Sequence, residues 1–142
     1  MRTSSWIVLL LASLACAAGC SKTSSGPSRA TGNSYVAAAA FWNPTGNATI
    51  WRTELLFDGK VIGAANFNPP GSAAELSGTI EGVKKGTHTL SIRIASQTSS
   101  PTTYEVIYAM IVPVMSGNET YEFGSVQRSV ATGESIGYSF EF

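Results

Sequence analysis

The stretch THTLSIRIAS, residues 87–96, decides the fold class. Its apolar residues Leu90, Ile92 and Ile94 alternate with small or charged ones, so one face of an extended segment is apolar and the other is polar. A helix would repeat its apolar positions about every 3.6 residues, and no segment after residue 34 sustains that period. The pattern predicts a strand that packs one face on a core.

A second stretch, TIWRTELLFDGKVIG at 49–63, predicts a hairpin. Apolar residues alternate on both sides of Asp58-Gly59, and Asp-Gly between two such runs is a strong signal for a two-residue turn. Further breaks rich in Gly and Pro divide the rest of the chain into short segments. We predict about eight strands: 35–42, 49–57, 60–65, 74–80, 87–96, 102–112, 119–130 and 134–142.

Two of these segments carry more specific expectations. Apolar residues fill nearly every position of YEVIYAMIV, 104–112, so we expect a central strand that is covered on both faces. The run Ala37–Ala40 favours helix by propensity, but it is short and lies between β-type sequences, so we expect strand. Many short strands with Gly and Pro turns predict an all-β fold, an antiparallel two-sheet sandwich spanning residues 35–142.

The order of a strand, the turn DGKVIG (58–63) and the phrase ELSGTIEGVKKGTHTLSIRIAS (75–96) resembles the immunoglobulin-like and fibronectin-III-like modules of bacterial surface proteins. The resemblance covers about half of the folded part and implies an immunoglobulin-like sandwich. It implies no ligand, because such modules bind unrelated partners. The cysteine pair of antibody domains is absent, since the only two cysteines are Cys16 and Cys20.

The first 19 residues are typical of an export signal. Arg2 precedes the almost wholly apolar run Trp6–Ala18. That run is too short to cross a bilayer as a helix, and it fits the apolar region of a secretory signal peptide. The alternative is a buried helix of the folded protein, which the polar sequence after it would leave with nothing to pack against.

The segment AAGC at 17–20 resembles the lipobox of bacterial lipoproteins, although family boxes usually begin with Leu. The resemblance implies cleavage between Gly19 and Cys20 and attachment of a diacylglyceryl lipid to the Cys20 thiol. Cys16 is a poorer candidate, because a bulky and a polar residue would hold the outer positions of its box. If Cys20 begins the mature chain, Cys16 leaves with the signal, and the two cysteines form neither a disulfide nor a metal site.

Residues 20–34 predict a lipidated cysteine followed by a flexible linker rich in Ser, Thr and Gly. A flexible chain of this length has a mean span of roughly 20 Å. Because two acyl chains hold a protein stably on a membrane, we expect a lipid-anchored protein of the bacterial cell envelope. Ser21 stands where lipoproteins retained at the inner membrane often have Asp, which favours the outer membrane.

Charge and residue counts exclude several partners. Lys+Arg and Asp+Glu number 9 each, so the chain has no basic field for nucleic acid. With a single histidine and no cysteine after Cys20, we expect no zinc or copper site. No loop of clustered Asp and Asn predicts calcium, and we expect no cofactor.

Few residues are suited to catalysis. His88, the only histidine, opens a predicted strand, where we expect a half-exposed surface side chain, and Asp58 lies in the predicted turn. A glycosidase needs two carboxylates that face each other across a cleft, and a small sandwich has little room for one. Solvated sheet faces account for the glutamates, so we expect no catalytic residue and no enzyme. These glutamates are Glu54, Glu105, Glu119, Glu122, Glu134 and Glu141.

The aromatic residues leave two interpretations open. Large aromatics usually fill the core of a sandwich, which favours buried positions for Trp42 and Trp51. If either side chain projects outward, it can stack on sugar rings as in carbohydrate-binding modules. We expect a non-enzymatic binding module that takes an envelope protein or a glycan as its partner. The alternatives are a carbohydrate-binding module with Trp42 and Trp51 as ligand contacts, or an inhibitor of a secreted hydrolase that uses FNPPGSAAE, 67–75, as a projecting loop.

Overall fold

The structure is a computed structural model that describes residues 34–44, 48–115 and 119–142. Within these ranges the chain forms nine strands and no helix. The strands are β1 (Tyr35–Asn43), β2 (Ile50–Phe57), β3 (Lys60–Asn68), β4 (Ser72–Ile80), β5 (Thr87–Gln97), β6 (Thr102–Pro113), β7 (Tyr121–Phe123), β8 (Val126–Val130) and β9 (Ser135–Glu141).

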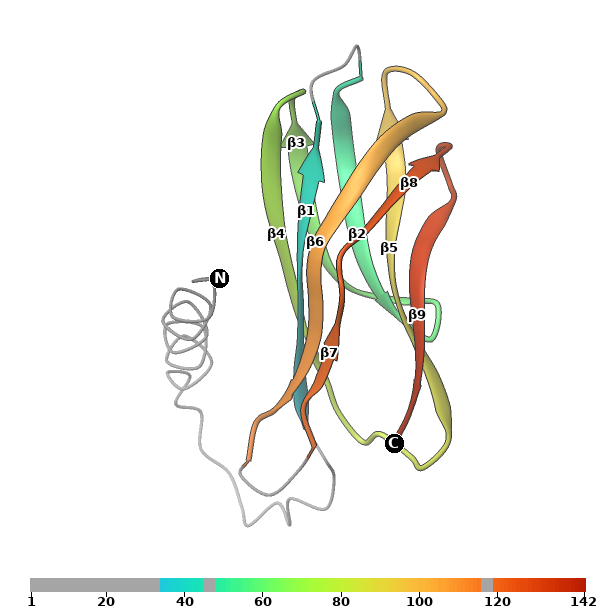
Figure 1. Cartoon of the computed structure of the whole chain (residues 1–142). Coiled ribbons are helices and arrows are strands. Elements are labelled where there is room, and N and C mark those ends of the chain that lie inside the picture. Colours follow the sequence, from blue (N-terminus) through green and yellow to red (C-terminus); the bar gives the residue numbers. More distant parts are fainter. Residues whose placement is uncertain (1–33, 45–47, 116–118) are drawn as a thin grey trace. The chain divides into compact units, whose positions relative to one another are not determined.

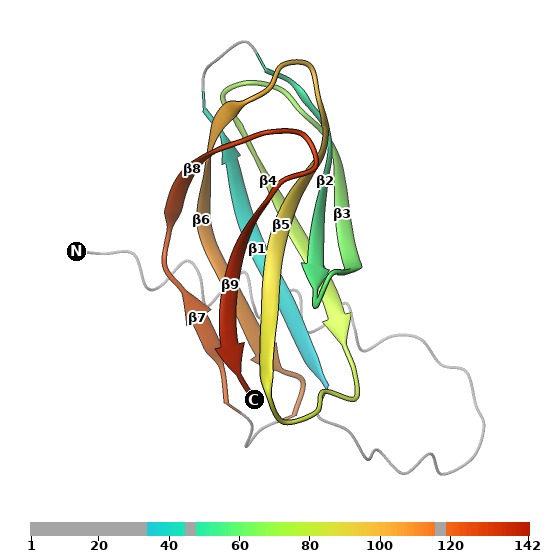
Figure 2. The ribbon, with the colours of Figure 1, turned by 90° about the vertical axis from the view of Figure 1, so that its right-hand side faces the viewer.

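The strands form two antiparallel sheets that pack face to face (Figure 1). The first sheet has the order β4–β1–β6–β7, and β8 pairs with β6 as well. The second sheet has the order β3–β2–β5–β9 and faces the viewer in Figure 2. The prediction of an all-β, antiparallel two-sheet sandwich is confirmed.

Except at 119–130, each predicted strand matches one observed strand, with ends that differ by at most three residues. Gly124 and Ser125 interrupt that segment and divide it into β7 and β8, which raises the strand number to nine. Both short strands pair with β6, β7 along Ala109–Ile111 and β8 along Thr102–Val106. The run Ala37–Ala40 is extended in β1, as expected.

β6 is central in its sheet, because it lies between β1 on one side and β7 and β8 on the other. The expectation that it is covered on both faces is wrong at Ile107, which is 45% exposed. The pairing of β6 with β1 shifts by one residue between Ala40 and Phe41. Ile107 is the extra residue of this bulge, with no partner in β1, and a bulge turns its side chain away from the ladder.

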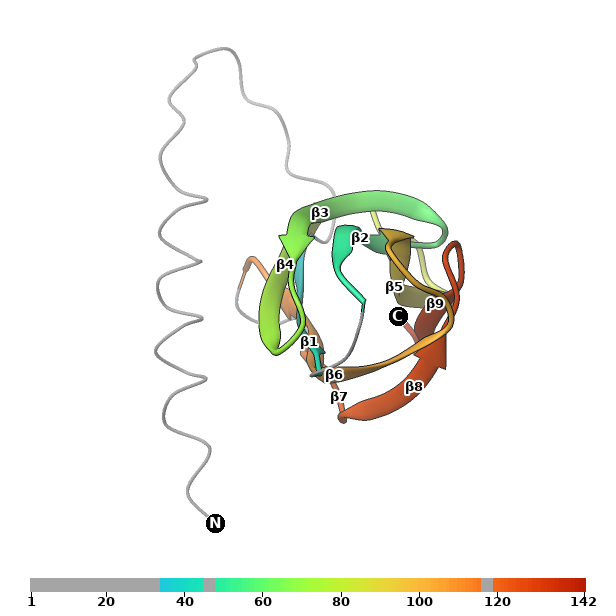
Figure 3. The same cartoon turned by 90° about the horizontal axis from the view of Figure 1, so that it is seen from above.

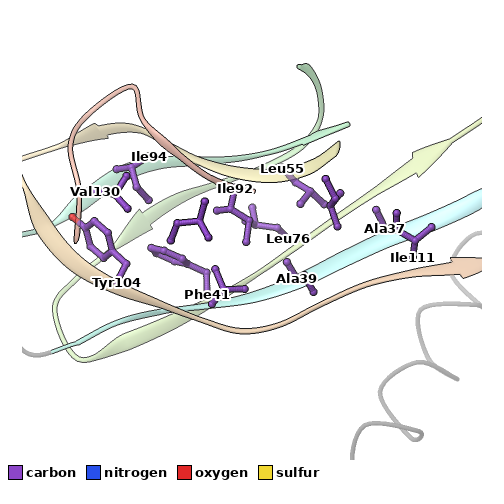
Figure 4. Packing of buried hydrophobic residues seen from close by; sticks show 14 of the residues in the cluster. Ala37, Ala39, Phe41, Leu55, Leu76, Ile92, Ile94, Tyr104, Ile111 and Val130 are labelled. Carbon is purple, nitrogen blue, oxygen red and sulfur yellow. The ribbon is translucent and has the colours of Figure 1, made fainter. Parts of the chain in front are cut away.

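The core fills the space between the two sheets. Leu90, Ile92 and Ile94, whose alternation predicted a strand, are all buried in β5. They face side chains of the first sheet, where the rings of Phe41 and Tyr104 lie 5.3 Å apart (Figure 4). Because the sequence offers no cysteine here, burial of apolar surface is the main stabilising term.

Strands β3 and β4 are edge strands of different sheets and lie side by side (Figure 3). Their backbones meet at Gly63 and Gly78. A Cβ on Gly63 would overlap the carbonyl oxygen of Ser77, and a Cβ on Gly78 would overlap the carbonyl oxygen of Ile62. Any side chain at either position would push the backbones apart, so both must be glycine. We name this contact the β3–β4 seam.

Candidate functional site

The two ends of the sandwich carry different connections. β1 runs from Tyr35 at one end to Asn43 at the other, and we name the ends the Tyr35 pole and the Asn43 pole (Figure 1). The β3–β4, β5–β6 and β8–β9 connections lie at the Asn43 pole, and the β2–β3 and β4–β5 connections lie at the Tyr35 pole. The described chain enters at Ser34, so the segment before the sandwich joins it at the Tyr35 pole.

Trp42 and Trp51 both project outward from the sandwich. Their exposed fractions are 37% and 51%, so the expectation that they fill the core is wrong. In β1 the neighbouring residue Phe41 faces the core, and in β2 Ile50 does so, which places each tryptophan on the opposite face of its strand. Because β1 and β2 belong to different sheets, the two tryptophans lie on opposite outer faces and do not form one site.

Trp51 instead pairs with Phe67 on the neighbouring strand β3. The ring centroids are 5.9 Å apart and the rings are tilted by 46° to each other. Phe67 is 63% exposed, more than Trp51. The two residues lie at the Asn43 pole, between the cross-strand pairs Ile50–Asn68 and Arg52–Asn66. We name Trp51 and Phe67 the aromatic pair, and it is the candidate functional site.

Phe67 adopts a backbone conformation that costs free energy. Its φ is 61°, in the left-handed region that disfavours residues with a Cβ. The next residue holds it there, because Asn68 is buried and its carbonyl oxygen accepts a hydrogen bond of 2.8 Å from Nδ2 of Asn43. Ser72 donates its hydroxyl to Oδ1 of Asn68 at 2.6 Å. Strained residues held by a rigid surround are common at functional sites.

The charged residues beside the aromatic pair are bonded to one another. Glu54 accepts a hydrogen bond from Nε of Arg52 at 2.8 Å and another from Nη2 of Arg93 at 2.5 Å. The bonds from Arg52 and then Arg93 hold the pKa of Glu54 below its ordinary value, against the opposing effect of burial. Glu54 is 8% exposed, so the expectation that it is a solvated residue is wrong. The physical reason is this pair of arginine partners.

His88 and Asp58, for which we expected no catalytic role, lie at the Tyr35 pole. Nδ1 of His88 is 2.7 Å from Oδ2 of Asp58, and Nε2 of His88 is 2.8 Å from the carbonyl oxygen of Lys84. The His88 ring stacks on Phe57, and its side chain is 13% exposed, so this partly buried histidine is more covered than the half-exposed surface position that we expected. Asp58 and Gly59 both have positive φ, which confirms the predicted turn.

The two groups shift each other's protonation. The hydrogen bond to Asp58 raises the pKa of His88 above its ordinary value, although burial opposes it, and the carbonyl oxygen of Lys84 adds to the effect. Burial alone would raise the pKa of Asp58, but the hydrogen bonds from His88 and from the N–H of Thr89 outweigh it and lower that pKa. Both ring nitrogens of His88 are therefore occupied by partners that stabilise the imidazolium.

The stretch 67–75 does not form a projecting loop. β3 continues to Asn68 and β4 begins at Ser72, so only residues 69–71 connect them. The N–H of Gly71 donates to the carbonyl oxygen of Asn43 at 2.7 Å, which ties this short turn to the end of β1. The inhibitor hypothesis needed a loop that reaches outward, and a tight turn replaces it.

The remaining expectations concern metal ions, membrane-spanning helices and the first residues of the chain. In the described ranges no group of three or more His, Cys, Asp or Glu side chains is arranged to hold a metal ion. The same ranges contain no helix that is long and apolar enough to cross a membrane. The predicted signal, its cleavage point, Cys20 and the linker up to residue 33 lie outside the described residues.

Comparisons of the chain with protein-family models, with curated proteins and with solved structures find no match. The site therefore has to be interpreted from its own geometry. Sequence reasoning singled out Trp51 but missed Phe67 as its partner. One feature of the sequence could have indicated it. Phe67 directly precedes the turn sequence Asn-Pro-Pro-Gly, and a side chain beside a turn at the end of a sandwich is often not covered by the core.

Proposed function

We propose that this protein is a lipid-anchored component of the bacterial cell envelope whose sandwich is a non-catalytic binding module. The observation that supports this most directly is the aromatic pair. Trp51 and Phe67 are exposed side by side at the Asn43 pole, and Phe67 keeps an unfavourable backbone conformation there. Exposed tryptophan and phenylalanine are enriched at the centres of binding sites, where they bury large areas.

The entry point of the chain supports an outward-facing role for this pair. The proposed anchor at Cys20 is followed by a linker that reaches the sandwich at Ser34, at the Tyr35 pole. The aromatic pair lies at the other pole. A domain tethered in this way carries its binding side chains on the end remote from the attachment point.

The path of the first five strands supports an immunoglobulin-like interpretation of the sandwich. In immunoglobulin domains, strand B pairs with E in one sheet while C pairs with F in the other. Here β1 pairs with β4, and β2 pairs with both β3 and β5, so β1 to β5 follow the course B, C, C′, E and F. The departure is β6, which occupies the place of strand A beside β1 although it follows β5 in the chain.

The geometry of His88 supports a non-catalytic role. A general base needs a ring nitrogen free to take a proton from a hydroxyl or a water. In His88 one nitrogen is bonded to Asp58 and the other to the carbonyl oxygen of Lys84. The pair ties the β2–β3 turn to β5, which is a structural use of the histidine.

The anchor is tested by replacing Cys20 with Ser in the full-length protein. We expect the parent to fractionate with outer membranes on a density gradient and to carry an acyl adduct by mass spectrometry. The Cys20→Ser protein should lose the adduct and leave the membrane fraction, and Cys16→Ser should do neither. A parent without an acyl adduct would contradict the proposed anchor.

The binding role is tested by crosslinking in intact envelopes followed by recovery of the protein. We expect a protein or a glycan to be recovered with the parent chain and with Trp42→Ala, and to be lost with Trp51→Ala. Turnover of a substrate that depends on His88 would overturn the non-catalytic role. If the crosslinked partner is recovered equally with the parent and with Trp51→Ala, the aromatic pair is not part of the binding site.

A further inference from the structure

We infer that the aromatic pair is a stacking site for a single, twisted polysaccharide chain. This inference rests on the proposed binding function and names its ligand. It is carried by the tilt of the two rings, by their isolation from other apolar surface, and by the polar groups beside them.

The two rings are spaced so that each can stack on a different sugar unit of one polysaccharide chain. Their centroids are 5.9 Å apart, so neighbouring sugar units can each meet one ring. The C–H face of a pyranose ring is apolar and slightly positive, and it complements the negative face of an aromatic ring. The 46° angle between the planes of Trp51 and Phe67 suits a chain that twists between successive units. It does not suit the flat surface of a crystalline polysaccharide, which needs coplanar rings.

The surroundings of the pair are polar rather than apolar. Asn66 on β3 is exposed, and the side chain of Arg52 is 46% exposed. These groups can donate hydrogen bonds to the hydroxyl rim of a sugar whose face lies on the rings. Stacking combined with hydrogen bonding at the rim is the chemistry that a pyranose requires.

A protein partner would need a larger apolar surface at this pole. A stable interface covers about 800 Å² on each partner and has an apolar centre. Among the described residues, exposed Val61 lies next to the β2–β3 turn, and exposed Val114 and Met115 follow the end of β6, so all three belong to the Tyr35 pole. Exposed Trp42 and Ile107 lie on β1 and β6, on the outer face of the first sheet, whereas the aromatic pair lies on the second sheet. The aromatic pair is therefore isolated from them, which favours a ligand of small cross-section.

A single-stranded nucleic acid would need free cations beside the rings. Arg52 and Arg93 share the carboxylate of Glu54. The described lysines Lys60, Lys84 and Lys85 lie at the β2–β3 and β4–β5 connections, at the Tyr35 pole. The remaining described cation, Arg128, lies on β8 in the other sheet. The surface around the aromatic pair on β2 and β3 therefore lacks the positive groove that a phosphate backbone follows.

The test uses the full-length protein extracted from membranes in detergent and titrated by calorimetry. The probes are soluble hexasaccharides of β-1,4-glucose, β-1,4-N-acetylglucosamine, β-1,3-glucose and α-1,4-glucose, together with microcrystalline cellulose and a single-stranded oligonucleotide. We expect at least one hexasaccharide to bind the parent and Trp42→Ala alike. Trp51→Ala and Phe67→Gly should bind it at least about tenfold more weakly.

One further variant and a measurement of folding keep the result interpretable. Trp51→Phe preserves a ring at this position and should retain most of the affinity, and thermal unfolding should show that each variant is folded. Absence of binding to all four hexasaccharides would overturn the inference, as would binding that Trp51→Ala and Phe67→Gly leave unchanged. Preferential binding to cellulose or to the oligonucleotide would also overturn it. A protein recovered through Trp51 without any sugar binding would refute the glycan ligand and leave the proposed binding function intact.

Discussion

The imidazole Nδ1 of His88 lies 2.7 Å from Oδ2 of Asp58, and this contact ties the start of β5 to the β2–β3 turn. The backbone strengthens the connection, since the N–H of Thr89 donates to Oδ1 of Asp58 at 2.8 Å and the N–H of Asp58 donates to the carbonyl oxygen of Thr89 at 2.9 Å. The ring of Phe57 covers the imidazole. A titrating ion pair is thus built into the packing of the Tyr35 pole.

We expect this pair to make the stability of the domain depend on pH. The folded-state pKa of His88 lies above 6.5, so its contribution is complete below pH 6.5 and is lost as the pH rises through the higher folded value. The folded-state pKa of Asp58 lies below 3.8, so its contribution is present above pH 3.8 and is lost as the pH falls through the lower value. The pair therefore stabilises the fold most between these two ordinary values.

Urea unfolding of the parent and of His88→Gln across this range checks the prediction. The glutamine keeps a hydrogen-bond donor but carries no titrating charge, so the free energy of unfolding of this variant should fall less on passing from weakly acidic to alkaline pH. The same decrease in both proteins would show that another group causes the dependence.

The β3–β4 seam predicts that two glycines are intolerant of a methyl group. Gly63→Ala and Gly78→Ala would each force a Cβ into a backbone carbonyl, and we expect each to lower the free energy of unfolding by more than about 2 kcal/mol. Gly137→Ala is the matched control, because the nearest atom to a Cβ there is 3.5 Å away in ordinary contact. Denaturant titration should leave the control near the parent, and equal losses at all three positions would contradict the seam.

The strain at Phe67 predicts an order of stability between two variants that both remove the ring. Phe67→Gly suits the positive φ, whereas Phe67→Ala retains the steric conflict of a Cβ. We expect the glycine variant to be more stable than the alanine variant by about 1 kcal/mol. Thermal unfolding of the two proteins measures the difference. The reverse order would mean that the backbone at this position relaxes once the ring is gone.

The two arginines that donate hydrogen bonds to Glu54 predict a second contribution to the stability of the fold, one that is lost in acid. Glu54→Gln should lower the free energy of unfolding by about 1 kcal/mol at neutral pH, a modest value because both arginines are partly exposed. The pKa of Glu54 lies below 4.5, so the difference from the parent should be present above that pH and vanish as the pH falls through the folded value. Glu122→Gln, at an exposed position of β7, should match the parent throughout.

Asn43, at the end of β1, predicts a large loss of stability even when it is replaced by a residue of the same shape. Nδ2 of Asn43 donates to the carbonyl oxygens of Asn68 and Ala48, and the side chain is fully buried. Asn43→Asp replaces this donor with an acceptor and should cost about 3 kcal/mol. Part of the loss should return in acid, where the introduced carboxyl group is protonated and can donate again. Asn66→Asp at an exposed position is the control, and unfolding curves at neutral and acidic pH separate the two cases.

The fold could be predicted because its determinants are local. Alternation places Leu90, Ile92 and Ile94 on one side of β5 whatever the neighbouring strands are, and Asp58-Gly59 supports a turn by its own conformational preference. The division of the segment 119–130 was not predicted. It depends on how β7 and β8 each pair with β6, and such long-range pairing leaves little trace in the short segment itself.

The candidate site was predicted only in part. Trp51 alternates with the buried Ile50, but Arg52 after it is exposed as well, and the pairing of β2 with β5 is irregular between Ile50 and Thr53, so alternation along the sequence did not show which face of this segment is buried. Its partner Phe67 lies on the next strand and is brought alongside by the register of β2 with β3. His88 was expected at the surface because sequence alone does not reveal that Phe57 and Asp58 enclose its ring.

The β3–β4 seam also bears on how the molecule behaves when it is crowded. An open edge strand presents unpaired N–H and C=O groups on which a strand of another chain can add, the first step of aggregation. At Gly63 and Gly78 the two edges lie against each other, with no room even for a methyl group between them. Each sheet thereby shields an edge of the other, and side chains larger than hydrogen at these two positions would expose both edges to neighbouring copies at once.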